Sequence, residues 1–197
     1  MARKTAEEAA KTRDAVIDAA LRVFAEKGFA GAQLDDIASR AGVTRGAVYH
    51  HFTDKTDLLQ VVLAERWPVA TAPLLEPLER LKGRPAIEGF LVAYLEALEK
   101  DETLRALLVL SSSGELPATI AGDGRDQKQQ VFARWLQLLD AQLKAAGASK
   151  SAPVRARSES ILAGLLGYAV LTSLGHRGRS YAATRAELIL SGALDGR

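Results

Sequence analysis

This 197-residue sequence contains no cysteine and only three histidines. Without thiols the chain can form neither a disulfide framework nor a cysteine-ligated metal site. Its 26 lysine and arginine residues are nearly balanced by 24 aspartate and glutamate residues, which leaves a formal net charge of +2. Such a small basic excess does not by itself indicate nucleic-acid binding, so any affinity for DNA must come from the local placement of charge.

The sequence also lacks a targeting segment and an apolar run long enough to cross a bilayer. Its first residues are charged and include no apolar segment, so a secretion signal is not expected. The longest apolar stretch, Ile161 to Leu174, is shorter than the roughly 20 residues that a membrane-spanning helix needs. We therefore expect a cytoplasmic protein that does not interact with a membrane.

Catalytic motifs are missing as well. No H-E-x-x-H, no G-x-S-x-G and no phosphate-binding loop occurs. His50 and His51 belong to a motif described below, and His176 lies in a basic stretch. The adjacent carboxylates Asp35 and Asp36 are explained by solvation on the outer face of a helix. We expect no enzyme activity, no metal and no cofactor, with an all-helical enzyme as the alternative.

What the sequence does contain is helical periodicity along most of its length. Hydrophobic residues make up 48% of the chain, enough to build a core. Apolar side chains recur at three- and four-residue spacing, and no segment alternates as a strand would. The fold class expected is all-α, with a three-helix helix-turn-helix domain in residues 1–55 and a larger helical domain in residues 56–197.

Prolines and small residues set the expected helix ends. The helix that Asp54 opens should be kinked or stopped by Pro68. Three further prolines are expected to break up the stretch that follows: Pro73, Pro77 and Pro85. Residues 111–126 contain serines, glycines and a proline, and we expect a mobile loop with a partial helical turn there.

Residues 33–52 have the pattern of a helix-turn-helix motif. Apolar residues recur at helical spacing from Leu34 to Ala41, and Gly42 follows where the chain must adopt a left-handed conformation. Thr44 then occupies the N-cap position of a second helix, expected over Arg45–His51. On this pattern alone, an ordinary helical corner with solvated polar residues is an alternative to a DNA-binding unit.

The second helix of the motif leaves outward residues that suit DNA. Arg45 can make a bidentate contact to guanine, and Ala47 can pack on a thymine methyl group. Gly46 lets the backbone come close. Tyr49 and His51 offer hydrogen bonds to phosphate groups. This helix is therefore the candidate recognition helix.

Basic residues near the motif could supply the local charge that the composition as a whole lacks. Lys55 lies in the first turn of the third helix, and a helix N-terminus is itself a phosphate site. Four more basic residues lie near the N-terminus: Arg3, Lys4, Lys11 and Arg13. They are interleaved with glutamates, so a solvated tail is an alternative to a DNA-binding patch.

Residues 13–59 closely resemble the DNA-binding domain of the tetracycline-repressor (TetR) family. The matching pieces are RDAVIDAALRVFAEKGFAG, LDDIASRAGVTRGAVYHHF and DKTDLL, and the opening MARKTAEEAAKTR is similar to multidrug-efflux regulators of the AcrR type. The resemblance implies that six residues align with the family's DNA-contact positions: Arg45, Gly46, Ala47, Tyr49, His51 and Lys55.

Two positions depart from the family pattern. Many members carry threonine where this chain has Gln33, a position that caps the first motif helix and touches phosphate. Glutamine is a poorer cap, although it can still donate to a phosphate group. Many members also carry tryptophan where this chain has His50. With the capping Thr44, these two residues complete the expected DNA-binding set.

The resemblance also implies a dimer. In the family the last two helices of each subunit usually pack as a four-helix bundle across a two-fold axis. Residues 161–174 are apolar nearly all round and must be buried on every side, either in such an interface or within the monomer. Two recognition helices related by symmetry would read a palindromic operator in double-stranded DNA.

Aromatic residues of the larger domain are the candidate effector site, because flat side chains with polar tips often line apolar pockets. The expected ligand-binding residues are Trp67, Phe90, Tyr94, Phe132, Trp135 and Tyr168. The alternative is that they are plain core. The family resemblance favours a repressor that a small hydrophobic or aromatic effector releases from DNA. A DNA-binding regulator without small-molecule control is the second possibility.

Overall fold

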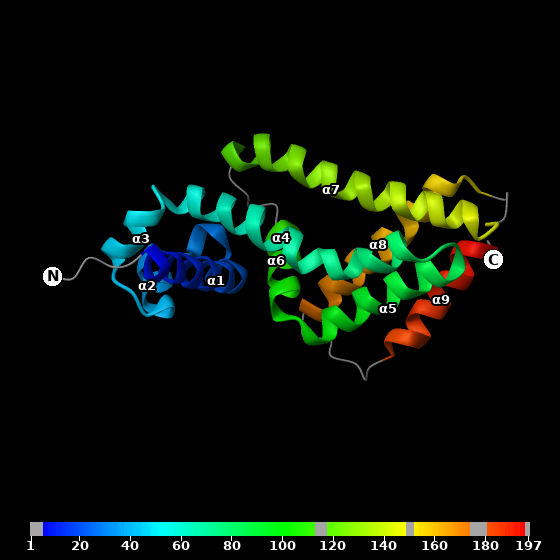
Figure 1. The fold of residues 1–197 in the computed structure, drawn as a ribbon, viewed down its shortest axis with the longest axis horizontal. Coiled ribbons are helices and arrows are strands. Elements are labelled where there is room, and N and C mark those ends of the chain that lie inside the picture. Colours follow the sequence, from blue (N-terminus) through cyan, green and yellow to red (C-terminus); the bar gives the residue numbers. More distant parts are fainter. Residues whose placement is uncertain (1–5, 113–117, 149–151, 174–180, 196–197) are drawn as a thin grey trace. The chain divides into compact units, whose positions relative to one another are not determined.

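The computed structural model describes residues 6–112, 118–148, 152–173 and 181–195, and within these ranges every regular element is a helix. The helices are α1 (Ala6–Gly31), α2 (Leu34–Ala41), α3 (Arg45–His51), α4 (Lys55–Arg80), α5 (Arg84–Lys100), α6 (Glu102–Ser112), α7 (Ala118–Ala145), α8 (Val154–Ser173) and α9 (Ala182–Asp195) (Figure 1). The expected all-α fold is confirmed. None of the described helices is long and apolar enough to cross a membrane.

The chain forms two compact units, and α4 contributes to both of them. The first unit comprises the described residues of Met1–Pro68 and Ala106–Gly124, and the second those of Val69–Arg105 and Arg125–Arg197. The first unit thus extends along α4 as far as Pro68. A functional division after residue 55 stays a prediction.

In the first unit, α1 packs against both α2 and α3 (Figure 1). The apolar stripe of α1, which includes Ile17 and Phe24, is buried, as are Ile37 of α2 and Val48 of α3. Gly28 interrupts α1 with a left-handed φ of 69°. Beyond it the ring of Phe29 stacks on Phe24 with centroids 5.8 Å apart, the hydrophobic contact expected after a glycine that ends a helix.

Helix α4 is longer than its prolines predict. The expected stop at Pro68 and the expected breaks at Pro73 and Pro77 are wrong, because the helix continues to Arg80. Each proline lacks only one N–H, so an isolated proline costs one intrahelical hydrogen bond and some steric strain. Burial of the segment beyond Pro68 offsets this cost. The buried residues there include Thr71, Leu74, Leu75 and Leu78.

The side chain of Gln142 in α7 stabilises the turn between α4 and α5 in the second unit through two hydrogen bonds. Its side-chain nitrogen donates to the Leu78 carbonyl at 2.8 Å, and its side-chain oxygen accepts from the Gly83 N–H at 2.8 Å. Gly83 has a φ of 67°, which an L side chain rarely adopts. Pro85 lies in the first turn of α5, where a missing N–H costs nothing.

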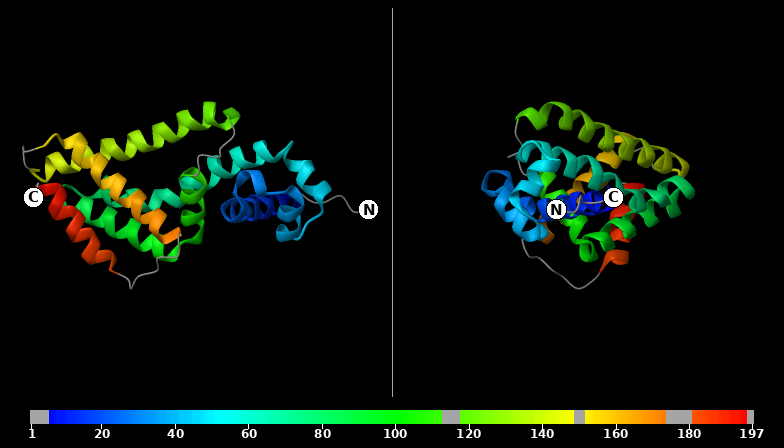
Figure 2. Two further views of the ribbon diagram at one scale, coloured as in Figure 1. Left: turned by 180° about the vertical axis from the view of Figure 1, so that it is seen from behind. Right: turned by 60° about the vertical axis from the view of Figure 1, so that its left-hand side comes forward.

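Helices α5, α8 and α9 pack against one another in the second unit, and Figure 2 shows them from two further sides. Helix α8 is buried on one face only, so the alternative that it is buried wholly within the monomer is wrong. Its buried residues include Ile161, Leu162, Leu165 and Ala169. The opposite face exposes Ala163, Gly164, Gly167, Val170 and Leu171.

The segment expected to form a loop over residues 111–126 is in large part helical. Helix α6 extends to Ser112, and α7 begins at Ala118. Residues 113–117 lie outside the described ranges. The expectation of a loop over the whole segment is therefore wrong for residues 118–126, which form the first turns of α7.

The contact between α4 and α5 gives a prediction for stability. A Cβ atom at Gly89 would lie 2.8 Å from Cβ of Pro77, and a proline ring on a helix cannot rotate away. Gly89→Ala should therefore lower the free energy of unfolding by about 1–3 kcal/mol, the usual cost of overpacking. The measurement is a urea unfolding curve.

Gly31→Ala is the matched control, because a Cβ there has its nearest neighbour at an ordinary 3.7 Å. It should leave the unfolding midpoint unchanged or raise it. Equal midpoints for the two variants would show that α4 and α5 can separate at Gly89 without cost.

Candidate nucleic-acid interface

The corner between α2 and α3 is built by backbone and capping hydrogen bonds. Gly42 has a φ of 67° and its N–H donates to the Ser39 carbonyl at 3.2 Å. Thr44 then caps α3, its hydroxyl accepting the Ala47 N–H at 3.2 Å. Gln33 makes no side-chain capping bond to α2, as expected of glutamine at this position. These contacts set the direction in which α3 presents its side chains.

Helix α3 buries one side and exposes the rest. Val48 is fully buried and Phe52, just after the helix, is 3% exposed. Four residues are exposed on the other side: Arg45, Gly46, Tyr49 and His50. Ala47 and His51 are half-buried. The expected outward set is thus only partly at the surface, and its contacts with DNA stay a prediction.

Arg45 is held by two neighbours. Its Nη1 atom forms an ion pair with Asp35 of α2 at 3.0 Å, and its Nη2 atom donates to the Tyr49 hydroxyl at 3.2 Å. The guanidinium carbon lies 5.5 Å from the centre of the Tyr49 ring. The hydrogen bond to Tyr49 and the charge of Asp35 raise the pKa of Arg45 above its ordinary value. Sequence reasoning missed this cluster.

The two adjacent carboxylates of α2 are not merely solvated. Asp36 forms an ion pair with Lys27 of α1 at 2.8 Å, and this hydrogen bond holds the pKa of Asp36 below its ordinary value. Asp35 pairs with Arg45. The explanation by solvation alone is therefore wrong: both acids connect α2 to a neighbouring helix. Ten residues separate Asp35 from Arg45, so only the fold brings the two together.

Lys55 contacts backbone carbonyls at the end of α1, which the sequence did not predict. Its Nζ atom donates to the carbonyls of Phe29 at 2.7 Å, Ala32 at 2.9 Å and Ala30 at 3.4 Å. The ammonium also lies 4.5 Å from the centre of the Phe29 ring. An ammonium has three N–H donors, so these three carbonyls can occupy all of them. Lys55 thus caps the C-terminal end of α1, and its phosphate contact stays a prediction.

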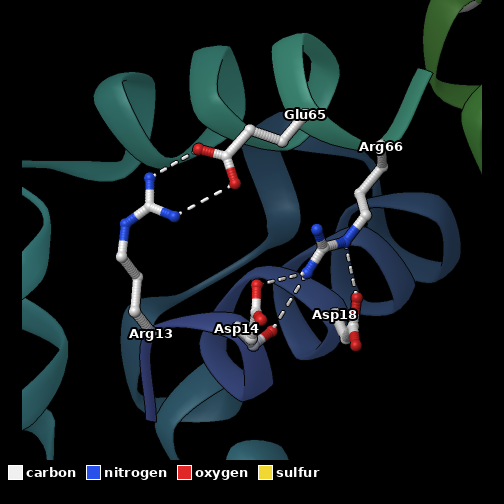
Figure 3. Close-up of polar contacts among 5 residues, drawn as sticks. All are labelled: Arg13, Asp14, Asp18, Glu65 and Arg66. Carbon is white, nitrogen blue, oxygen red and sulfur yellow. Dashed lines mark hydrogen bonds and ion pairs between the residues drawn. The ribbon is translucent and has the colours of Figure 1, made fainter. Parts of the chain in front are cut away.

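Ion pairs join α1 to the first half of α4 (Figure 3). Arg13 makes a two-pronged contact with Glu65, with N···O distances of 2.6 and 3.0 Å. Arg66 reaches back to Asp14 at 3.0 Å and to Asp18 at 2.7 Å. The hydrogen bond from Arg13 holds the pKa of Glu65 below its ordinary value. We call these five residues the α1–α4 clamp.

The two described residues of the basic patch expected near the N-terminus both have partners within the protein. Arg13 belongs to the α1–α4 clamp, and Lys11 pairs with Glu7 one helical turn away at 2.7 Å. Arg3 and Lys4 lie outside the described residues. The same described ranges contain no group of three or more histidine, aspartate or glutamate side chains placed to hold a metal ion.

Four of the six aromatic residues expected to bind an effector form one cluster in the second unit. The Trp135 ring centre lies 5.9 Å from Phe90, 6.0 Å from Tyr94 and 6.1 Å from Phe132. Tyr94 is fully buried, and its hydroxyl has no hydrogen-bond partner among the described residues. Burial raises the pKa of that hydroxyl, so at neutral pH it remains a donor.

Trp67 and Tyr168 complete the expected set. Trp67 belongs to the first compact unit, and the cluster to the second. Tyr168 of α8 lies beneath Arg185 of α9, whose guanidinium carbon is 4.5 Å from the ring centre. An effector site formed by all six residues stays a prediction.

Comparison with known proteins identifies the family. The profile described as "Bacterial regulatory proteins, tetR family" matches residues 16–62, which span the helix-turn-helix. The HTH-type transcriptional repressor BepR of Brucella suis biovar 1 is 33% identical over 144 residues, which cover 70% of this chain and 68% of BepR. The chain belongs to the TetR family. The expectation drawn from the motif is confirmed.

Other members of the TetR family resemble the chain over shorter or more divergent stretches. The HTH-type transcriptional regulator SrpR of Pseudomonas putida is 62% identical over 66 residues, 34% of this chain and only 31% of SrpR. The structure of FadR from Bacillus subtilis in complex with stearoyl-CoA superposes with a TM-score of 0.72 at 19% identity, covering 93% of this chain and 98% of FadR. That likeness shows a shared fold.

The partners of Lys55 give a prediction that separates a cap from a phosphate contact. Lys55→Met keeps an unbranched apolar stem but removes three hydrogen bonds to backbone carbonyls, two of them part-buried. We expect the free energy of unfolding to fall by about 1–3 kcal/mol, measured by chemical denaturation without DNA. Lys27→Met, which breaks one exposed ion pair, should cost less than about 1 kcal/mol. Equal and small losses would mean that Lys55 does not stabilise the end of α1.

Proposed function

We propose that this TetR-family chain is a cytoplasmic transcriptional repressor that binds a palindromic DNA operator as a homodimer. A small hydrophobic or aromatic effector releases it. The proposed function is regulatory and uses no cofactor or catalytic step. A repressor among the relatives, BepR, matches 70% of the chain, and SrpR is 62% identical to it over 66 residues.

The observation that carries this proposal is the exposed surface of α3. Arg45, Gly46 and Tyr49 lie exposed on a capped helix whose inner side is fixed by Val48. The N-terminal residues of a recognition helix reach base edges, and arginine is the commonest reader of guanine. The surface therefore has the side chains, the exposure and the rigidity that readout of the major groove requires.

Replacing the guanine reader tests this assignment. Arg45→Ala should weaken operator binding by about 1–3 kcal/mol and relax base preference at one position in each half-site. The measurement is a footprint titration on a selected palindrome. Arg80→Ala, which removes the same side chain from an exposed ion pair of α4, is the control and should bind like the parent. Unchanged binding by Arg45→Ala would remove α3 as the recognition helix.

The exposed face of α8 supports the homodimer. Small residues on this face, including Gly164 and Gly167, would let a second helix approach closely. Leu171 of α8 is 49% exposed and Leu188 of α9 is 70% exposed. Helices α8 and α9 pack against each other, so apolar side chains lie uncovered on neighbouring elements. A four-helix bundle with a second copy would cover them.

A charge on this face should separate the subunits. Leu171→Glu would place a carboxylate in an apolar interface, so we expect a folded monomer by sedimentation at micromolar concentration, with loss of operator binding. Leu81→Glu is the matched control, because Leu81 has the same residue type and the same 49% exposure outside α8 and α9. A dimeric Leu171→Glu protein, or a monomeric parent, would contradict the proposed assembly.

The effector is the less direct part of the proposal. Its support is the aromatic cluster around Trp135, the unpartnered Tyr94 hydroxyl inside that cluster, and the stearoyl-CoA that FadR, with its similar fold, binds. An apolar ligand with one hydrogen-bond acceptor would satisfy the hydroxyl. Helix α4 runs through both compact units, so a ligand that favours one tilt of α4 can change operator affinity. A coupling of about 1–3 kcal/mol would lower that affinity roughly 5- to 150-fold.

Tyr94→Phe separates an effector site from a plain core. Without ligand, loss of an unsatisfied buried hydroxyl should leave the melting temperature unchanged or raise it. With stearoyl-CoA or a panel of hydrophobic drugs and aromatic metabolites, the parent should show a higher melting temperature and quenched tryptophan fluorescence. The variant should bind the active compound several-fold more weakly. A parent that responds to none of these compounds would favour the alternative, a DNA-binding regulator without small-molecule control.

A further inference from the structure

Two side chains of the protein hold the guanidinium of Arg45. Asp35 and the Tyr49 hydroxyl each accept one hydrogen bond from it, at 3.0 and 3.2 Å. Each of these side chains is about half exposed or more, so the cluster lies on the surface that α3 presents. We infer that Asp35 is a specificity-determining residue: it positions Arg45 for one base and keeps it from phosphate groups.

The donor count makes simultaneous contacts possible. A guanidinium carries five N–H donors, of which Asp35 and Tyr49 take two. A bidentate contact to O6 and N7 of guanine needs two more. Arg45 can therefore keep both protein partners while it reads a base. An arginine already held in position loses less rotamer freedom on binding than a mobile one does.

The charge of Asp35 would help Arg45 to discriminate between a site with the right guanine and unrelated DNA. An unrestrained arginine on this surface could contact any phosphate oxygen, and such contacts carry no sequence information. The carboxylate offers Arg45 a competing partner and repels phosphate groups. It therefore lowers affinity for unrelated DNA more than affinity for a site with guanine at the right position, which is specificity by disfavouring wrong partners.

The neighbouring residue provides a matched control. Asp36 also lies in the first turn of α2 and also forms an ion pair, but with Lys27 of α1 at 2.8 Å and not with Arg45. Asp35→Asn and Asp36→Asn remove the same charge from adjacent positions. Both pairs are largely exposed and contribute little to stability, so both variants should melt close to the parent.

The inference rests on the proposed DNA-binding function, and one experiment tests both. The full-length parent and each variant select from a library of random duplexes, and affinities are then measured for the selected and an unrelated duplex. The parent and Asp36→Asn should select the same palindrome. Asp35→Asn should lose preference at one position in each half-site, with the affinity ratio falling about tenfold, within the range of one bidentate base contact.

A longer carboxylate provides the rescue. Asp35→Glu can reach Arg45 again and should restore the preference, which a merely structural role for Asp35 would not predict. An Asp35→Asn protein that selects the parent palindrome with an unchanged affinity ratio overturns the inference and leaves the proposed function intact. A parent that selects no motif overturns the proposed function and this inference with it.

Discussion

Attachment of α4 to α1 is the constraint on which the arrangement of the first unit depends. Both α2 and α3 pack on α1, so whatever holds α4 to α1 also holds it to α3, the proposed recognition helix. The α1–α4 clamp provides one attachment at Glu65 and Arg66, and Lys55 provides a second at the other end of the segment. Ten residues of helix separate Lys55 from Glu65, about 15 Å along the axis, so the two attachments set the direction of α4 as well as its position.

This arrangement has a consequence for regulation in the proposed function. Individually, exposed ion pairs contribute little to stability, but here several share one helix pair and restrain one motion. A change in the tilt of the first half of α4 would carry α1, and hence α3, along with it. Helix α4 continues past Pro68 into the second unit, and in the proposed function it is the element through which a ligand there would act.

Basic side chains of the first unit are paired in a way that the small net charge of the chain does not reveal. Arg13, Lys27 and Arg45 each face a carboxylate, and Lys55 faces backbone carbonyls. These basic side chains therefore stabilise the unit that carries the proposed recognition surface, and only part of their hydrogen-bonding capacity is left. In the proposed function this favours readout by few, well-positioned contacts over a broad electrostatic patch.

The sequence by itself determined the local structure of the motif and the family. The turn at Gly42, the Thr44 cap and the limits of α3 follow from backbone preferences within a few residues, which do not depend on the rest of the chain. Local preferences alone gave the wrong end for α4. A proline does disfavour a helix at Pro68, but burial of leucines beyond Pro68 outweighs that cost.

Tertiary structure alone decided which polar groups meet. Asp35 with Arg45, Lys55 with the end of α1, and Arg13 with Glu65 are separated by 10 to 52 residues, and no periodicity in the sequence links them. The exposed face of α8 is a similar case. The sequence shows that α8 is apolar, but only the packing of α5 and α9 decides which of its faces is covered within the chain and which is exposed.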